Sequence, residues 1–159
     1  MSHTIREYSD EDYRAIFEIT MLAFAPIHES FKRILGNQVF SLVYPDWKKS
    51  HAKYLKSLCK GKDKKNILVV ENDGVVVGFV SFFIFLKNKE GELGLNAVHP
   101  NHQGRGIGKK MYKAVLSRMK KRGVKFVKVG TGGDVSHLPA RRAYPSIETE
   151  RVRGSRSKG

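Results

Sequence analysis

A glycine-rich turn near the middle of the chain has the residue types that bind an anion. Gln103–Gly108 reads Gln-Gly-Arg-Gly-Ile-Gly, with glycine at alternate positions, and it directly precedes an amphipathic helical pattern. The first N–H groups of a helix have no intrahelical acceptor, and the helix dipole makes this end electropositive. Glycines leave those groups uncovered, and Arg105, Lys109 and Lys110 add positive charge. The pattern predicts a site for a ligand that carries phosphate.

Two other phosphate-binding motifs fit this turn poorly. A P-loop requires a serine or threonine after its lysine, and the pair Lys109-Lys110 is followed by Met111. A dinucleotide fingerprint opens a βαβ unit and has an acidic residue about 20 positions later. Here the turn follows a run of predicted antiparallel strands, which is a different context.

Helical patterns precede those strands. Ser9–Asp12 resembles a capping box and opens a helix that we expect to end at Pro26. The next segment, 27–44, is ambiguous, and one interpretation is a short helix at Phe31–Leu35 that Gly36 stops. A further helix is expected from Pro45 or Asp46 to about Lys60.

The predicted strands form a meander. A first strand is expected at 3–8, and an apolar strand at 67–71 leads into Asn72-Asp73-Gly74, a strong hairpin signal. Return strands follow at 75–86 and 92–98. After the glycine-rich turn, a helix is expected from Gly106 to about Arg122, with Gly123 as its cap. A strand at 124–129 then follows a crossover helix and should lie parallel to the strand before it.

Composition indicates one folded domain with a strongly basic surface. The chain has 159 residues, 40% of them hydrophobic, and a net charge of +15. That charge suits a polyanionic partner such as RNA, but a solvated lysine-rich surface explains it as well. Neither a signal peptide nor a membrane span is visible. The single cysteine, Cys59, excludes an internal disulfide, so we expect a cytoplasmic protein.

The signature Gln-x-x-Gly-x-Gly at Gln103–Gly108, with this order of elements, resembles the GNAT superfamily of N-acetyltransferases from residue 3 to Tyr144. The resemblance implies an α/β (α+β) fold: a mixed, mostly antiparallel sheet with a β-meander, a splayed pair of parallel strands and flanking helices. It places one acetyltransferase domain at 1–144.

The resemblance also implies the donor and the residues that hold it. The donor would be acetyl-CoA, with no metal. Its pyrophosphate would lie on backbone amides, and its pantetheine arm would bond to the backbone of a strand. The implied residues are Gln103, Gly104, Arg105, Gly106, Ile107, Gly108 and Lys109 for the pyrophosphate, Ala97 and Val98 for the arm, and His137 as a further contact to the arm.

Direct transfer to an amine needs a base for the ammonium proton and an acid for the departing thiolate. Tyr144 occupies the position where many GNAT members place a tyrosine acid; the alternative is a buried aromatic. Glu92 is the candidate base, because strict alternation places it on one face with Gly94, Asn96 and Val98. The alternative for Glu92 is a solvated side chain without a catalytic role. The alternative for His137 is a surface position.

The chain departs from the family pattern after Tyr144. Members usually continue into a hairpin that completes the sheet, whereas Pro145 here begins a basic segment, 145–159, with few apolar residues. We expect this tail to be irregular and the C-terminal hairpin to be missing. The strand at 124–129 would then be an exposed edge that favours a homodimer.

Three functions therefore remain at the level of the sequence. The first is an N-acetyltransferase acting on a primary amine of a small molecule or a protein. The second is a CoA-binding protein with little catalytic activity and a regulatory role, and the third is an RNA- or ribosome-associated module. The acceptor cannot be read from the sequence.

Overall fold

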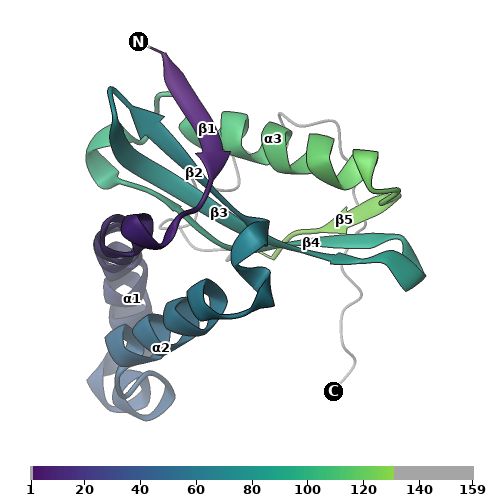
Figure 1. The fold of residues 1–159 in the computed structure, drawn as a ribbon. Coiled ribbons are helices and arrows are strands. Elements are labelled where there is room, and N and C mark those ends of the chain that lie inside the picture. The colour runs from purple at the N-terminus through teal and green to yellow at the C-terminus, as the bar shows by residue number, and fades with distance from the viewer. Residues whose placement is uncertain (1, 131–159) are drawn as a thin grey trace.

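The computed structural model describes residues 2–130, which form one five-stranded sheet covered by helices on both faces (Figure 1). The strand order follows the chain, β1-β2-β3-β4-β5. The strands are β1 His3–Glu7, β2 Ile67–Asn72, β3 Val75–Phe85, β4 Glu90–Val98 and β5 Phe126–Lys128. The α-helices are α1 Tyr13–Val43, α2 Trp47–Lys60 and α3 Ile107–Lys121, and short 3-10 turns lie at Asp10–Asp12, Lys62–Asn66, Leu86–Asn88 and Pro100–His102.

The meander and the crossover have the predicted directions. Strands β1 to β4 pair antiparallel, and the β2–β3 hairpin turns through Asp73 and Gly74, whose φ angles are 52° and 78°. Two consecutive left-handed residues are typical of the turn that an Asp-Gly pair favours. After α3 the chain enters β5 parallel to β4, which confirms the predicted parallel pair.

Two apolar cores hold the helices to the sheet. The core beneath α3 contains Leu68, Val80 and Phe82 of the sheet, packed against Met111 and Val115 of the helix. The opposite core joins the sheet to α1 and α2, and Figure 1 shows these two helices on the face away from α3. None of the helices between residues 2 and 130 has an apolar stretch long enough to cross a membrane.

Helix α1 is longer than predicted, and the predicted end at Pro26 is wrong. The helix continues through Pro26 and leaves helical geometry only at Gly36, with φ 77° and ψ 161°. A proline inside a helix costs about 3 kcal/mol, and packing on both sides outweighs that cost: Thr20 and His28 are buried before and after it. The prediction that Gly36 interrupts the helix is confirmed.

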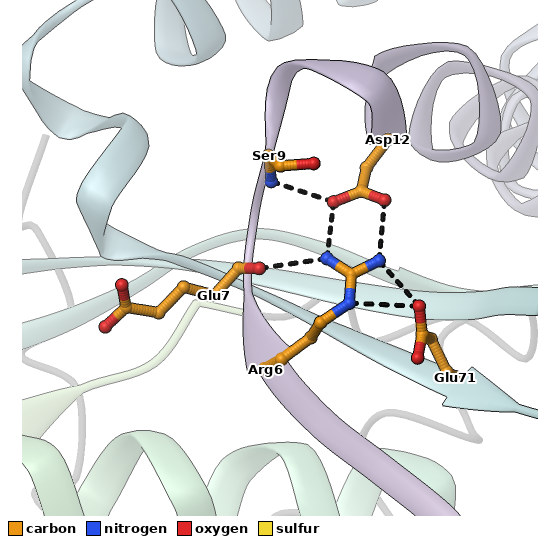
Figure 2. A network of polar contacts seen from close by, with 5 residues as sticks. All are labelled: Arg6, Glu7, Ser9, Asp12 and Glu71. Carbon is orange, nitrogen blue, oxygen red and sulfur yellow. Dashed lines mark hydrogen bonds and ion pairs between the residues drawn. The ribbon is translucent and has the colours of Figure 1, made fainter. Parts of the chain in front are cut away.

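Arg6, near the end of β1, binds the carboxylates of Asp12 and Glu71 (Figure 2). Both Nη atoms of Arg6 donate to Asp12, at 2.7 and 2.8 Å, and the Nε and Nη2 atoms donate to Glu71 at 2.9 and 2.6 Å. The Asp12 carboxylate also accepts the Ser9 amide at 2.8 Å. Because only 7% of the Asp12 side chain is exposed, this network ties β1, β2 and the start of α1 together.

The network makes stability depend on pH. Hydrogen bonds from Arg6 hold the pKa of Asp12 below its usual value. A group whose pKa is lower in the folded state stabilises the fold above its unfolded pKa of about 3.9, and this contribution is lost as pH falls toward the folded pKa. In urea titrations, the difference in unfolding free energy between wild type and Asp12→Asn should therefore narrow from pH 6 to pH 3. A constant difference would contradict this assignment.

Candidate functional site

The glycine-rich turn delivers the chain into α3 with its first amides uncovered. Gly106 is the N-cap and is left-handed, with φ 77°, and the first intrahelical bond runs from the Lys110 amide to the Gly106 carbonyl at 3.1 Å. The amides of Ile107, Gly108 and Lys109 therefore have no intrahelical acceptor. The Ile107 side chain is 1% exposed and anchors this end in the core. The helix start is thus a fixed, electropositive end whose N–H groups can bind an anion.

A side chain connects this turn to the end of β4. The amide of Gln103 donates from its Nε2 atom to the Val98 carbonyl at 3.1 Å. This contact was not predicted, because Gln103 entered the sequence analysis only through its backbone amide. It places the last residue of β4 directly beside the start of α3. An extended ligand could therefore pass from the helix start onto the strand without a break.

Strand β4 has an open edge beside this contact. Its pairing with β5 ends at Glu92 and Lys128, so that within residues 2–130 the rest of β4 has no ladder partner on that side. The His99 amide donates to Val77 of β3 at 2.8 Å. Because the backbone groups of neighbouring strand residues point to opposite sides, those of Val98 face the open edge. This diverging pair agrees with the predicted splayed strands.

The same alternation changes one predicted contact. Ala97 lies opposite Phe79 and turns its backbone groups toward β3, so they do not reach the open edge. Asn96, opposite Val80, directs its N–H and C=O to the same side as those of Val98. The backbone groups that face the open edge are therefore those of Asn96 and Val98, whereas those of Ala97, the other member of the predicted pair, face β3.

A β-bulge also changes the position of Glu92. The register with β3 shifts between Val80 and Phe82, which inserts one extra residue into β4 near Gly94. Glu92 lies opposite Phe83, which packs in the core beneath α1 and α2. The side chains of Asn96 and Val98 are on the α3 face instead. The prediction that Glu92 shares a face with them is wrong, because a bulge reverses the alternation.

Two polar side chains outside the predicted site, those of Asn96 and Ser81, stabilise this bulge. Asn96 donates to the Gly94 carbonyl at 2.8 Å and accepts from the Tyr112 hydroxyl of α3 at 2.8 Å. On the other face, the Ser81 hydroxyl donates to the Leu95 carbonyl at 2.9 Å. These bonds fix the distorted part of β4 relative to α3. The string Glu-Leu-Gly-Leu-Asn held the only signal, a glycine and an asparagine inside a strand pattern.

Glu92 is exposed and lies where the pairing of β4 and β5 ends. Burial of Tyr54 on α2 raises the pKa of that tyrosine, and the negative charge of Glu92 adds to the rise. The neighbouring Glu90 pairs with Lys128 at 2.6 Å and raises the pKa of that lysine. A carboxylate at the point where β4 and β5 separate is in a position to accept a proton from a group that enters between the two strands.

Cations surround the helix start. Lys110 lies 3.4 Å from the Nδ1 atom of His3, and slight burial together with that ammonium lowers the pKa of His3. His3 is therefore neutral near pH 7, and the positive charge belongs to Lys110 and to the nearby Arg105. Tyr144 and His137 lie outside the described residues. Within residues 2–130, no group of three or more His, Cys, Asp or Glu residues could hold a metal ion.

Comparison with known proteins decides the family. A profile described as the Acetyltransferase (GNAT) family matches residues 12–146. The chain belongs to the GNAT family of acetyltransferases. A protein of Archaeoglobus fulgidus, described as an uncharacterized N-acetyltransferase, is 34% identical to this GNAT chain over 108 residues, which are 65% of this chain and 69% of that protein.

Solved structures share the GNAT fold. PaiA N-acetyltransferase from Thermoplasma acidophilum, in complex with coenzyme A, has a TM-score of 0.66 at 20% identity and covers 92% of this chain and 89% of its own. A GNAT family acetyltransferase from Brucella melitensis, in complex with acetyl-CoA, has a TM-score of 0.61 at 25% identity, with 83% and 78% covered. The ribosomal-protein-S18-alanine N-acetyltransferase of Escherichia coli has a TM-score of 0.63 at 20% identity and covers 92% of this chain and 77% of its own.

Family membership identifies the protein as an acyltransferase that takes its acetyl group from acetyl-CoA. The fold expected from the sequence is confirmed: a mostly antiparallel sheet with one parallel pair, flanked by helices. The family match defines the kind of reaction and its donor. The acceptor and the roles of single residues require arguments from the site itself.

Proposed function

We propose that this GNAT enzyme transfers acetyl directly from acetyl-CoA to a primary amine of a small molecule or a protein, along the open edge of β4. The observation that carries the proposal is the bond from Gln103 to the Val98 carbonyl. It joins an anion-binding helix start and a strand with directed backbone groups into one continuous path. Acetyl-CoA has the matching shape, with a charged pyrophosphate at one end and an extended amide-bearing arm.

The pyrophosphate would be held by the amides of Gln103 to Lys109. Those of Ile107, Gly108 and Lys109 have no intrahelical acceptor, and the glycines leave room for the phosphate oxygens. The charges of Arg105 and Lys110 add attraction from the rim. The helix dipole and these cations act in the same direction, which favours a doubly charged group.

The pantetheine arm would add to β4 as an extra strand. Its amides would pair with the backbone groups of Asn96 and Val98, which face the open edge. The arm would pass Val98 first, beside the helix start. Farther along, the Asn96 N–H would lie nearer the thioester carbonyl and stabilise the negative charge that develops on its oxygen. His137 would contact the arm from the segment beyond the described residues.

The transfer itself needs three proton movements. Glu92 would take a proton from the ammonium, directly or through one water, so that the nitrogen lone pair attacks the thioester carbon. The C–N bond forms, the C–S bond breaks, and Tyr144 would donate its proton to the departing thiolate. The nitrogen then loses its second proton, which would return through water to the Tyr144 oxygen and restore the hydroxyl. Because Glu92 faces the side of α1 and α2, the acceptor would approach from that side while the cofactor path lies against α3.

A glutamine at position 92 tests the assignment of the base. Glu92→Gln should lower kcat by about 100-fold and leave the Kd for acetyl-CoA unchanged, because the side chain lies at the far end of the cofactor path. The measurement is thiol release from acetyl-CoA across a panel of primary amines at one fixed pH, with kcat and KM determined separately.

Glu90→Gln is the matched control, because it removes a carboxylate two residues away that pairs with Lys128. It should keep kcat within about threefold of wild type. If both variants lose activity equally, a local structural effect explains the loss and Glu92 is not the base. Binding of acetyl-CoA without thiol release for any amine would contradict the proposed acetyl transfer and favour a CoA-binding regulatory protein.

Four further expectations stay predictions: the domain boundary at Tyr144, the irregular tail, the homodimer and the cytoplasmic location.

A further inference from the structure

Helix α2 has a row of lysines along its outer face. Lys49, Lys53, Lys56 and Lys60 follow one another at intervals of four, three and four residues, which is the spacing of a single line on a helix. All four are exposed, whereas the opposite side of the helix buries Leu55, Leu58 and Cys59 in the core. We refer to these four residues as the lysine row.

The row lacks the acidic residues that normally accompany lysines on a solvated helix. No aspartate or glutamate occurs in Trp47–Lys60, and in the described part of the chain no ion pair holds any member of the row. On α1, by contrast, Arg14 pairs with Glu18 one turn away at 3.3 Å. Like charges at these spacings repel one another and destabilise a helix. A polyanion on this face would remove the repulsion.

The geometry of the row suits a regular polyphosphate. From Lys49 to Lys60 the helix rises about 16 Å at 1.5 Å per residue. Over this length of its axis, a nucleic-acid duplex presents about five phosphates of each strand, one per 3.4 Å of axis. Four flexible ammonium groups therefore meet a nearly equal number of phosphates. A duplex carries this charge at every backbone unit whatever its sequence, whereas an acidic protein segment carries it only where its sequence places carboxylates.

We propose that α2 binds the phosphodiester backbone of a nucleic acid through the lysine row. The row is separate from the acetyl-CoA path, because α2 covers the face of the sheet opposite to α3 (Figure 1). It contacts phosphates and no base edges, so binding is independent of sequence and depends strongly on salt. The proposal is independent of the acetyl transfer described above.

The test compares binding of duplexes by wild type and by the quadruple variant Lys49→Gln, Lys53→Gln, Lys56→Gln, Lys60→Gln. The probes are a fluorescein-labelled 20-base-pair DNA duplex and the RNA duplex of the same sequence, measured by fluorescence anisotropy at 50 to 200 mM salt. The tighter duplex identifies the nucleic acid. For that duplex the variant should bind at least about tenfold more weakly than wild type at 50 mM salt. The slope of log K against log salt should be less negative than that of wild type by about 3 to 4.

The matched control removes the same charge elsewhere. Lys113→Gln, Lys120→Gln, Lys121→Gln and Lys125→Gln alter four exposed lysines on or just after α3, and this variant should bind the duplex within about threefold of wild type. Both variants should keep the far-ultraviolet circular dichroism and the acetyl-CoA affinity of wild type. Equal losses in the two variants would overturn the proposal, because net charge alone would explain them. Binding of polyglutamate but of neither duplex would overturn it in favour of an acidic protein.

Discussion

Replacing Gly106 by leucine should weaken acetyl-CoA binding about 100-fold, which corresponds to about 2.7 kcal/mol. Gly106 has φ 77° and no atom within 4 Å of the position where a Cβ would stand. The Cβ of a leucine there would point into open space at the helix start, and we expect its side chain to crowd the position where the pyrophosphate would lie. It also strains the left-handed backbone that aims the amides. Isothermal titration calorimetry with acetyl-CoA measures the effect.

Gly123→Leu is the matched control for that experiment. Gly123 has φ 84° and the same open surroundings, but it follows the other end of α3. Both variants should lose about 1 to 2 kcal/mol of unfolding free energy from the left-handed backbone, and only Gly106→Leu should lose affinity. If the Gly106 variant binds acetyl-CoA within threefold of wild type, the helix start does not hold the pyrophosphate.

Replacing Arg6 by alanine should lower the free energy of unfolding by about 3 kcal/mol. The change leaves the carboxylates of Asp12 and Glu71 close together without their cation, and their side chains are only 7% and 22% exposed. It also removes the donor that holds β1 against the start of α1 (Figure 2). Urea denaturation at pH 7 followed by circular dichroism gives the value.

An exposed ion pair provides the comparison for Arg6. Arg14 lies 3.3 Å from Glu18 with 90% of its side chain exposed, and such pairs contribute no more than about 0.5 kcal/mol. Arg14→Ala should therefore change stability by less than that. A loss below 1 kcal/mol for Arg6→Ala would mean that solvent screens the network and that packing alone positions β1.

Local sequence signals predicted the parts of the fold that depend on few residues. The Asp73-Gly74 pair predicted a hairpin because both residues tolerate left-handed backbone. The glycines before Ile107 predicted an uncovered helix start because glycine has no side chain to cover the first N–H groups. The parallel direction of β5 followed from the crossover through α3. In each of these cases a few neighbouring residues were enough to determine the local conformation or the strand direction.

The features that the sequence did not reveal depend on contacts between distant residues. Pro26 does not end α1, because tertiary packing outweighs the local cost of a proline. The bulge in β4 arises from its pairing with β3 and from the bond between Asn96 and Tyr112, which are 16 residues apart. That single extra residue moves Glu92 to the opposite face from Asn96. The lysines of α2 looked dispersed along the sequence, and only the helix aligns them.

The corrected face of Glu92 has a consequence for the reaction. Cofactor and acceptor would meet at the open edge of the sheet from opposite sides, with the donor path against α3 and the base toward α1 and α2. A bulge at this point lets one strand serve both sides, because its first part and its last part present different faces. The proposed mechanism therefore depends on the bonds of Asn96 to Gly94 and Tyr112.

A crystal structure of the complex with acetyl-CoA would show the cofactor path itself. We expect the pyrophosphate oxygens within hydrogen-bond distance of the amides of Ile107 to Lys109, and the pantetheine arm paired with Asn96 and Val98. We also expect the thioester carbonyl near the Asn96 N–H. A cofactor bound away from the start of α3, or an arm that does not contact this edge of β4, would contradict this path.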